Sequence, residues 1–367
     1  MFEVGKPVTG ANFFDRTQQK KNLQTFMRNK TNVMISAPRR YGKTSLVKEI
    51  LGDSEYIYLD FMKRANFRLM AEDLLNGAYA MEGLVAFVDK AKYHVTELFA
   101  SHDIKGSLSI GDISLGIELV KSSEKDDCTV FLEALEIAER LAKKKQKCIT
   151  IVFDEFQEIV NLECKGDILK MLRSQLQDAE HIHSVFLGSI ESVMNHIFSN
   201  RNSPFYNYCR KMELKPFDMK ELSQQLVEIL LSKGIVFDSI DDFEKFLDKL
   251  GGHPANTMLA VQILYYRMIE KGTVALVKQD DMSHAYEDAF YERKDAVIQM
   301  IMRAKTKKHY QDVLYHMANG TEADIDSQTL YKARRGLVDM GLVVHRDRDD
   351  YCIADNFLVE YLKEKTQ

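Results

Sequence analysis

The sequence has few of the features that mark secreted or membrane-bound proteins. Its five cysteines are scattered, odd in number and without C-x-x-C spacing, which argues against a disulfide framework or a zinc site. No run approaches the roughly 20 apolar residues that cross a bilayer, and the first residues do not resemble a secretion signal. These absences predict a protein of the reducing cytoplasm that makes no membrane contact.

The sequence also lacks a basic surplus and any tract of low complexity. Its net charge is -5 and its pI is near 6.1, so any contact with nucleic acid must come from a local patch. The chain has only five prolines, and 45% of its residues are hydrophobic, which indicates that it is folded throughout. At 367 residues it is long for one hydrophobic core, so we expect two or three domains.

The N-terminal half alternates apolar runs with amphipathic stretches. Four apolar runs are typical of strands, at residues 32–36, 56–61, 148–156 and 183–189. Helical spacing occupies residues 67–101, 129–146, 165–178 and 189–198. This alternation predicts a parallel sheet with helices on both faces. Residues 107–119 instead alternate with period two around Gly111-Asp112, which predicts a hairpin inserted near residues 105–120.

The C-terminal part reads as helices alone from about residue 212, with Gly234, Gly251 and Gly272 where helices should end. Roughly the last 60 residues show a helix, a short strand, a charged turn, a second strand and a final helix, which is the order of a winged helix-turn-helix. The predicted organisation is therefore an α/β core of the P-loop NTPase class over residues 1–211, an all-α lid over 212–285 and a winged helix-turn-helix domain over 286–367.

Residues 36–45, SAPRRYGKTS, nearly match the phosphate-binding loop G-x-x-x-x-G-K-[ST], with Ala37 in place of the first glycine. The predicted strand before the loop and helix after it supply the context that such a loop requires. Loop N–H groups and the positive end of the helix would bind phosphate, Lys43 would neutralise its charge, and the Thr44 hydroxyl would bind Mg²⁺. Ala37 is acceptable because the strand end needs a small side chain more than a positive φ. The alternative is a chance Gly-Lys-Thr at the start of a helix.

Two adjacent acids, Asp154 and Glu155, close the apolar run that begins at residue 148. Open α/β sheets place ligand contacts at this end of a strand. Asp154 can hold Mg²⁺ there, and Glu155 can orient or deprotonate an attacking water. Two acids beside a core are costly without a cation to pair with. The alternative is that both acids only cap the next helix. Together with the loop, the pair favours nucleotide hydrolysis over binding alone.

Six motifs occur along the chain in the order NFFDR, APRRYGKTSLV, IVFDEFQEI, FLGSIESVM, SPFYN and GGHPANTMLAVQIL. Together they resemble the archaeal-type ATPases of the AAA+ and signal-transduction P-loop NTPase superfamily, over residues 10 to about 275. The resemblance implies ATP and Mg²⁺ as ligands and a C-terminal winged helix. The chain departs from many AAA+ proteins at Ala37 and at the start of the lid, which lacks the sensor-2 arginine.

The resemblance also assigns residues by position. It implies that Phe14, Asp15 and Arg16 lie at the adenine pocket, and that the turn at His253 and Pro254 brings the lid to the base. The remaining implied nucleotide contacts are Ala37, Pro38, Arg39, Arg40, Tyr41, Gly42, Lys43, Thr44 and Ser45. The implied catalytic residues are Lys43, Glu155 and Ser189, the last as the sensor-1 group for the γ-phosphate, and the implied metal ligands are Thr44 and Asp154.

The origin of an arginine that would stabilise the transition state stays open. Arg201 and Arg210 would act from a neighbouring subunit of a homo-oligomer. Arg39 and Arg40 would act within the chain, or would simply be solvated or paired at the loop.

The expected recognition helix of the C-terminal domain, residues 326–341, carries Lys332, Arg334 and Arg335, and the expected wing carries His345, Arg346 and Arg348. Residues 303–367 nevertheless hold eleven basic and eleven acidic residues, whereas a domain dedicated to DNA usually has a basic surplus. Double-stranded DNA, a protein partner and packing within the chain therefore remain alternatives.

The sequence thus predicts a Mg²⁺-dependent ATPase that closes its lid on ATP and reopens it on hydrolysis to ADP, and that couples this cycle to DNA or protein binding by the tail. The alternative is a slow nucleotide-dependent switch that acts through partner binding rather than turnover. A P-loop kinase for small molecules fits less well, because Asp154-Glu155 matches a water-activating pair and no acceptor pocket is readable.

Overall fold

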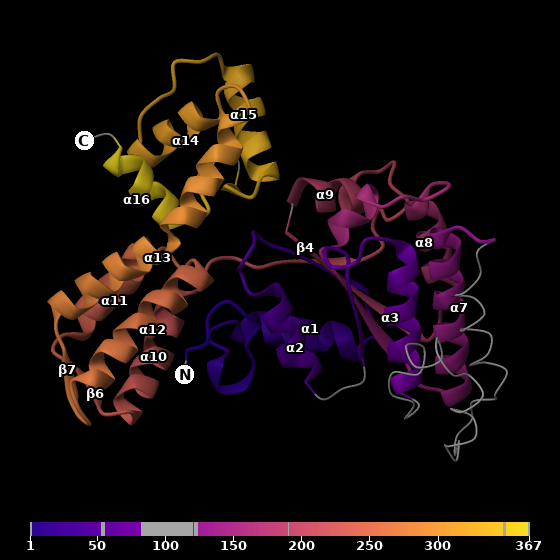
Figure 1. Cartoon of the computed structure of the whole chain (residues 1–367), viewed down its shortest axis with the longest axis horizontal. Coiled ribbons are helices and arrows are strands. Elements are labelled where there is room, and N and C mark those ends of the chain that lie inside the picture. Colours follow the sequence, from indigo (N-terminus) through magenta and orange to yellow (C-terminus); the bar gives the residue numbers. More distant parts are fainter. Residues whose placement is uncertain are drawn as a thin grey trace.

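A parallel sheet of five strands, in the order β2-β3-β4-β1-β5, lies at the centre of the N-terminal part (Figure 1). The computed structural model describes residues 2–52, 56–81, 120, 124–189, 191–347 and 350–365. The strands are β1 Val33–Ser36, β2 Tyr56–Asp60, β3 Ile149–Asp154, β4 Ile182–Gly188 and β5 Arg210–Glu213. The helices around them are η1 Gly10–Asn12, α1 Thr17–Arg28, α2 Lys43–Leu51, α3 Phe67–Ala80, α7 Asp127–Lys145, η2 Phe156–Asn161, α8 Ile168–Asp178 and α9 Glu191–Ser199.

The strand order sets the position of the chemistry. Strand β4 lies between β1 and β3, with Ser36 opposite Gly188 and Phe153 opposite Phe186. Because all three strands run in parallel, their carboxyl ends meet at one edge of the sheet. The loop after β1, the residue after β4 and the acids at the end of β3 are therefore neighbours.

Each face of the sheet has its own apolar core. Neighbouring residues of a strand point to opposite faces, and Phe153 and Phe186 contribute to one core while Val152 and Val185 contribute to the other. The first core includes α3, α7 and α8, and the rings of Phe153 and Phe186 stack within it at 4.9 Å. The second includes α1 and α2. The central strands are apolar on both faces for this reason, as expected for a covered parallel sheet.

The C-terminal part follows as two groups of helices joined by α13 (Figure 1). The lid group comprises α10 Met219–Ser232, β6 Ile235–Phe237, α11 Ile240–Lys249, α12 Pro254–Glu270, β7 Ala275–Val277 and α13 Gln279–Lys305. The last group comprises α14 Tyr310–Asn319, α15 Ser327–Asp339, β8 Val343–Asp347, β9 Asp350–Ile353 and α16 Asn356–Glu364. Strands β8 and β9 pair in antiparallel fashion, so the last group has the element order expected of a winged helix. The boundary proposed between residues 285 and 286 falls inside α13.

The expectation of helices alone after residue 212 is wrong at three short strands. Strand β5 adds to the sheet beside β1, and β6 pairs with β7 in parallel. Arg210, Lys211 and Glu213 make up three of the four residues of β5, so this exposed edge strand has no apolar run. The helix expected to start at residue 165 begins at Ile168. Helix α3 is described as far as Ala80, and the hairpin predicted over 107–119 lies outside the described residues.

One pair of cysteines corrects the sequence analysis. Cys128 at the start of α7 and Cys164 before α8 form a disulfide, with their Cα atoms 5.5 Å apart. The prediction that the cysteines do not pair is wrong here, because 36 residues separate the two positions in the sequence and only the packing of α7 against α8 brings them together. Cys148, Cys209 and Cys352 form no disulfide among the described residues.

In the part of the chain that the structure describes, no helix combines the length and the hydropathy that crossing a bilayer requires. The glycine positions expected at helix ends are confirmed, since Gly234, Gly251 and Gly272 follow α10, α11 and α12 with φ of 78°, 65° and 128°.

Gly234 is the most constrained of these glycines. A Cβ atom at this position would lie 2.2 Å from the backbone oxygen of Thr273, and the left-handed φ would strain any other residue. We expect Gly234→Ala to lower the free energy of unfolding by about 2 to 4 kcal/mol, because backbone must move as well. Denaturant unfolding measures this. Gly320→Ala is the control, since Gly320 has φ 65° with open space around it, and should cost only about 1 kcal/mol. Equal losses in the two variants would contradict the argument.

Candidate functional site

The loop between β1 and α2 turns at two residues with left-handed backbone. Arg40 has φ 68°, and Gly42, the N-cap of α2, has φ 85°. Ala37 is buried and does not have a positive φ. Position 37 therefore does not have the backbone conformation that favours glycine, as expected. The loop ends at the start of α2, and the first N–H groups of a helix have no partner within the helix and can bind anions.

Lys43 is a buried cation at the start of α2. Its side chain is 5% exposed, and its Nζ donates to the carbonyl oxygens of Ala37, at 2.9 Å, and Pro38, at 3.2 Å. Burial lowers the pKa of the Lys43 ammonium to about 8, although Glu155 and Asp154 act in the opposite direction. Neutral carbonyls are weak partners for a buried charge, and an anion in the loop would be a stronger one.

Asp154 lies opposite, at the end of β3. Its Oδ2 accepts hydrogen bonds from the Thr44 hydroxyl, at 2.9 Å, and from the Tyr58 hydroxyl, and its Oδ1 accepts from the N–H of Glu155 at 2.9 Å. Burial raises the pKa of the Asp154 carboxyl, while the bonds from Tyr58 and Thr44 lower it. The loop hydroxyl and the strand acid expected to share a metal ion thus lie in direct contact.

Glu155 is held by two residues at the next strand end. Its backbone is left-handed, with φ 50°, which is an uncommon conformation for this residue type. Its Oε2 accepts from Ser189 Oγ and from Gln157 Nε2, both at 2.5 Å, and the N–H of Ser189 donates to Gln157 Oε1 at 3.2 Å. The side chain of Glu155 is therefore fixed in place by a closed set of hydrogen bonds.

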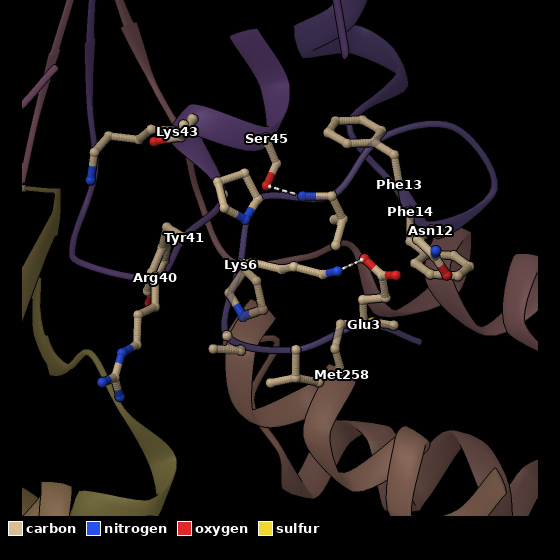
Figure 2. Close-up of a pocket in the computed structure, with 18 of the residues that line it drawn as sticks. Glu3, Lys6, Asn12, Phe13, Phe14, Arg40, Tyr41, Lys43, Ser45 and Met258 are labelled. Carbon is tan, nitrogen blue, oxygen red and sulfur yellow. Dashed lines mark hydrogen bonds and ion pairs between the residues drawn. The ribbon is translucent and has the colours of Figure 1, made fainter. Parts of the chain in front are cut away.

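A cavity of about 350 Å³ opens beside these residues (Figure 2). The N-terminal segment, residues 3–8, forms one wall, and there Lys6 pairs with Glu3 at 3.1 Å and the N–H of Val8 donates to Ser45 Oγ at 3.1 Å. The lid supplies another wall that includes Met258. Apolar residues predominate away from the loop: Val4, Pro7, Phe13, Phe14, Phe217, Pro254, Ala255 and Met258.

Arg16 ties the loop to the beginning of the lid. Its guanidinium donates to the carbonyl oxygens of Lys215, at 2.6 Å, and Tyr41, at 3.3 Å, and lies 4.9 Å from the centre of the Phe217 ring. The neighbouring Asp15 accepts from the N–H of Asp218 at 3.1 Å. Burial lowers the pKa of Arg16 and raises that of Asp15. These two residues therefore join the core to α10.

The C-terminal helices also reach the loop. The Tyr41 hydroxyl donates to the carbonyl oxygen of Ala354 at 3.0 Å, and the Tyr41 ring meets the His253 ring edge to face at 5.1 Å. His253 is the N-cap of α12 and lies 3.9 Å from a carboxylate oxygen of Asp355. Burial lowers the pKa of His253, whereas Asp355 raises it. Asp355 also accepts from Asn256 Nδ2 at 2.6 Å, so one carboxylate joins the lid to the last helix.

The structure brings most of the expected site residues to the cavity. Its lining includes Phe14, Arg16, Arg40, Tyr41, Gly42, Lys43, Thr44, Ser45, Glu155 and Pro254. The other expected residues do not line it: Asp15, Ala37, Pro38, Arg39, Asp154, Ser189 and His253. Of these, Asp154 and Ser189 are bonded to lining residues, Thr44 and Glu155 respectively, while Arg39 is exposed.

The sequence analysis missed four contributors to the site. Tyr58 stands in an ordinary strand pattern, and the N-terminal segment and Arg293 of α13 carry no motif. Gln157 did offer a signal, since it lies two positions after Glu155 within the motif IVFDEFQEI, and the structure shows that it is buried.

The residues present fit a nucleotide with a divalent cation. Carboxylate and hydroxyl oxygens are the ligands that Mg²⁺ prefers, and Asp154 and Thr44 offer them together. The buried ammonium of Lys43 and the start of α2 fit phosphate oxygens. The apolar part of the cavity suits a planar base.

Three comparisons bear on this site. The family model described as "ATPase domain predominantly from Archaea" matches residues 13–259. No curated protein matches the chain. Among solved structures, the Walker-type ATPase PABY2304 of Pyrococcus abyssi is similar over 99% of both chains, at 18% identity and a TM-score of 0.73. The ORC2 protein of Aeropyrum pernix, in its ADPNP-ADP complexes, is similar over 96% of this chain and 94% of its own, at 12% identity and a TM-score of 0.52.

The burial of Lys43 predicts a stability change that depends on pH. The pKa of Lys43 is about 8 in the folded protein, against an ordinary lysine value of 10.5. The charged ammonium therefore costs stability below about pH 8, and this cost disappears as the pH rises toward the pKa of the unfolded chain. We expect Lys43→Met to raise the free energy of unfolding of the nucleotide-free protein by about 1 to 2 kcal/mol near neutral pH, with the gain vanishing at high pH.

Denaturant unfolding at several pH values measures this gain. Lys21→Met is the matched control, because Lys21 is exposed on α1 and its change should be small at every pH. A Lys43→Met variant that is less stable than the wild type at neutral pH would contradict the burial cost.

Proposed function

Because the chain belongs to the family of ATPase domains found predominantly in Archaea, we propose that this ATPase works with Mg²⁺ and transmits its nucleotide state to the lid and the C-terminal helices. The observation that carries the proposal is the meeting of the Lys43 loop and the Asp154-Glu155 pair beside one cavity. The contacts of Arg16 and Tyr41 with the later helices supply the route for transmission.

Each site residue has a role that its geometry supports. Lys43 and the N–H groups of α2 bind the phosphates. Thr44 and Asp154 hold the cation, which when bound neutralises phosphate charge. Glu155 orients and deprotonates the attacking water, and Ser189, through its bond to Oε2, holds the carboxylate of Glu155 ready near the γ-phosphate.

The base has a place between Phe14, which precedes α1, and Met258 of the lid. Both residues line the cavity, so a base between them would join the core to α12. Binding would then favour the closed lid, because only the closed form offers both walls. After hydrolysis, loss of the γ-phosphate would weaken the closed form.

The phosphate loop transmits the nucleotide state to the C-terminal helices. Tyr41 lies in the phosphate loop and donates to Ala354, so a loop that rearranges around phosphate changes this contact. Helix α15 also packs against α9, which follows directly after the Ser189 strand end. A slow switch that acts through partner binding uses the same contacts, and the turnover rate separates it from a fast ATPase.

A second candidate function, DNA binding by the tail, rests on one face of α15. Tyr331, Lys332 and Arg335 are exposed there, whereas Arg334 lies over the Tyr351 ring at 5.5 Å. The packing of α15 against α9 favours regulation of this face by the core. Arg201 and Arg210 are exposed as well, so either residue suits contact with a neighbouring copy in a homo-oligomer.

Glu155→Gln tests the hydrolytic role. The amide cannot take a proton from water, so we expect kcat to fall by about 10²- to 10⁴-fold while ATP remains bound. Phosphate release and retention of labelled ATP measure the two effects. Glu158→Gln is the matched control, since Glu158 lies three residues on in η2 and its carboxylate accepts a hydrogen bond from Asn161. Turnover unchanged in Glu155→Gln would contradict the assignment.

Replacing Lys332, Arg334 and Arg335 with alanine tests DNA binding. If α15 contacts phosphates, wild-type protein binds duplex DNA more weakly as salt rises, and the triple variant loses this binding with a smaller salt slope. Anisotropy of a labelled duplex at low and high salt measures both. Replacing Lys305, Lys307 and Lys308 instead is the charge-matched control. An absence of wild-type binding at low salt would leave packing against the core as the role of α15.

A further inference from the structure

Arg293 brings a cation to the cavity from a helix far away in the sequence. It lies in the middle of α13, the long helix that joins the lid to the C-terminal helices (Figure 1). Its side chain lines the same cavity as Lys43 and Thr44. No motif assigns a role to this residue.

The guanidinium of Arg293 has buried N–H donors without hydrogen-bond partners among the described residues. These donors are on its Nε and Nη2 atoms. Buried polar groups are normally bonded, and leaving a charged donor unsatisfied costs more than leaving a neutral one. An unsatisfied guanidinium at the wall of a cavity is therefore suited to a ligand that accepts hydrogen bonds.

The charges around Arg293 indicate the sign of that ligand. Burial lowers the pKa of Arg293, Arg40 of the phosphate loop lowers it further, and Asp355 raises it. Two guanidinium groups, those of Arg40 and Arg293, thus line the same cavity close enough to interact, and the carboxylate of Asp355 acts on Arg293. That carboxylate is already engaged, since Asp355 accepts from Asn256 and from the N–H of Phe357.

The loop side of this arrangement is visible in the close-up. In Figure 2 the side chain of Arg40 extends away from Lys43, so the two loop cations point to different places. A polyphosphate in the loop carries more negative charge than Lys43 alone neutralises, so a second cationic group can bind to it. Guanidinium groups match phosphate oxygens with two parallel hydrogen bonds.

We propose that Arg293 binds the phosphates of the nucleotide, so that α13 closes the phosphate site opposite the loop. This inference rests on the proposed function, because it needs a nucleotide in the cavity. Arg293 then links the phosphates to the helix that carries the C-terminal group, and its unsatisfied donors are met only when a nucleotide is bound.

The test compares ATP and adenosine as probes, each measured by titration calorimetry or competition in the full-length protein. We expect Arg293→Gln to weaken ATP binding by about 10- to 100-fold, as for a hydrogen bond to a charged group, and to leave adenosine binding within twofold. Arg293→Lys should recover part of the ATP affinity because it restores the charge. Arg303→Gln, an exposed arginine on the same helix, is the matched control and should bind ATP as the wild type does.

ATP binding by Arg293→Gln within twofold of the wild type would overturn the inference, as would an equal loss of adenosine and ATP binding. Wild-type protein that binds no ATP would instead overturn the proposed function and the inference with it.

Discussion

The burial of opposite charges at one edge of the sheet is the constraint on which the site depends. Lys43 and Asp154 are each 5% exposed, and burial shifts both pKa values toward the neutral form. Among the described residues, no charged side chain bonds directly to either group; carbonyl oxygens accept from the ammonium, and hydroxyls donate to the carboxylate. Phosphate and a divalent cation would supply the missing charges, so the fold maintains a site whose charges are balanced best with its ligands present.

The order of the strands determines where the residues of this site lie relative to one another. With β4 between β1 and β3, Ser189 must emerge between the loop and the acids, and it bonds to Glu155. The left-handed backbone of Glu155 turns the chain directly after Asp154, so two adjacent acids take different directions. One meets the loop hydroxyl, and the other meets Ser189 and Gln157. Strain of this kind is typical of positions where function requires a particular direction.

The rest of the chain gathers around the loop rather than forming an independent unit. Arg16 donates a hydrogen bond to the carbonyl oxygen of Lys215, just before the lid helices, and Tyr41 donates one to the carbonyl oxygen of Ala354, just before the last helix. One apolar cluster runs from the lid through α13 to the C-terminal helices and includes Phe2 of the N-terminal segment. A rearrangement of the loop would therefore change a contact with a segment more than 300 residues away in the sequence, and the proposed coupling of nucleotide to tail rests on this contact.

The sequence by itself determined the features that depend on neighbouring residues: the loop and its tolerance of Ala37, the acid pair after an apolar strand, and the glycines at helix ends. Each follows from local backbone conformation or from the period of apolar residues. Tertiary structure alone decided the features whose partners are distant in the chain. Strand β5 pairs through its backbone despite its charged side chains, Cys128 meets Cys164, and Tyr58 and Arg293 reach the site from elements without a motif. No local pattern records such contacts, because packing between elements creates them.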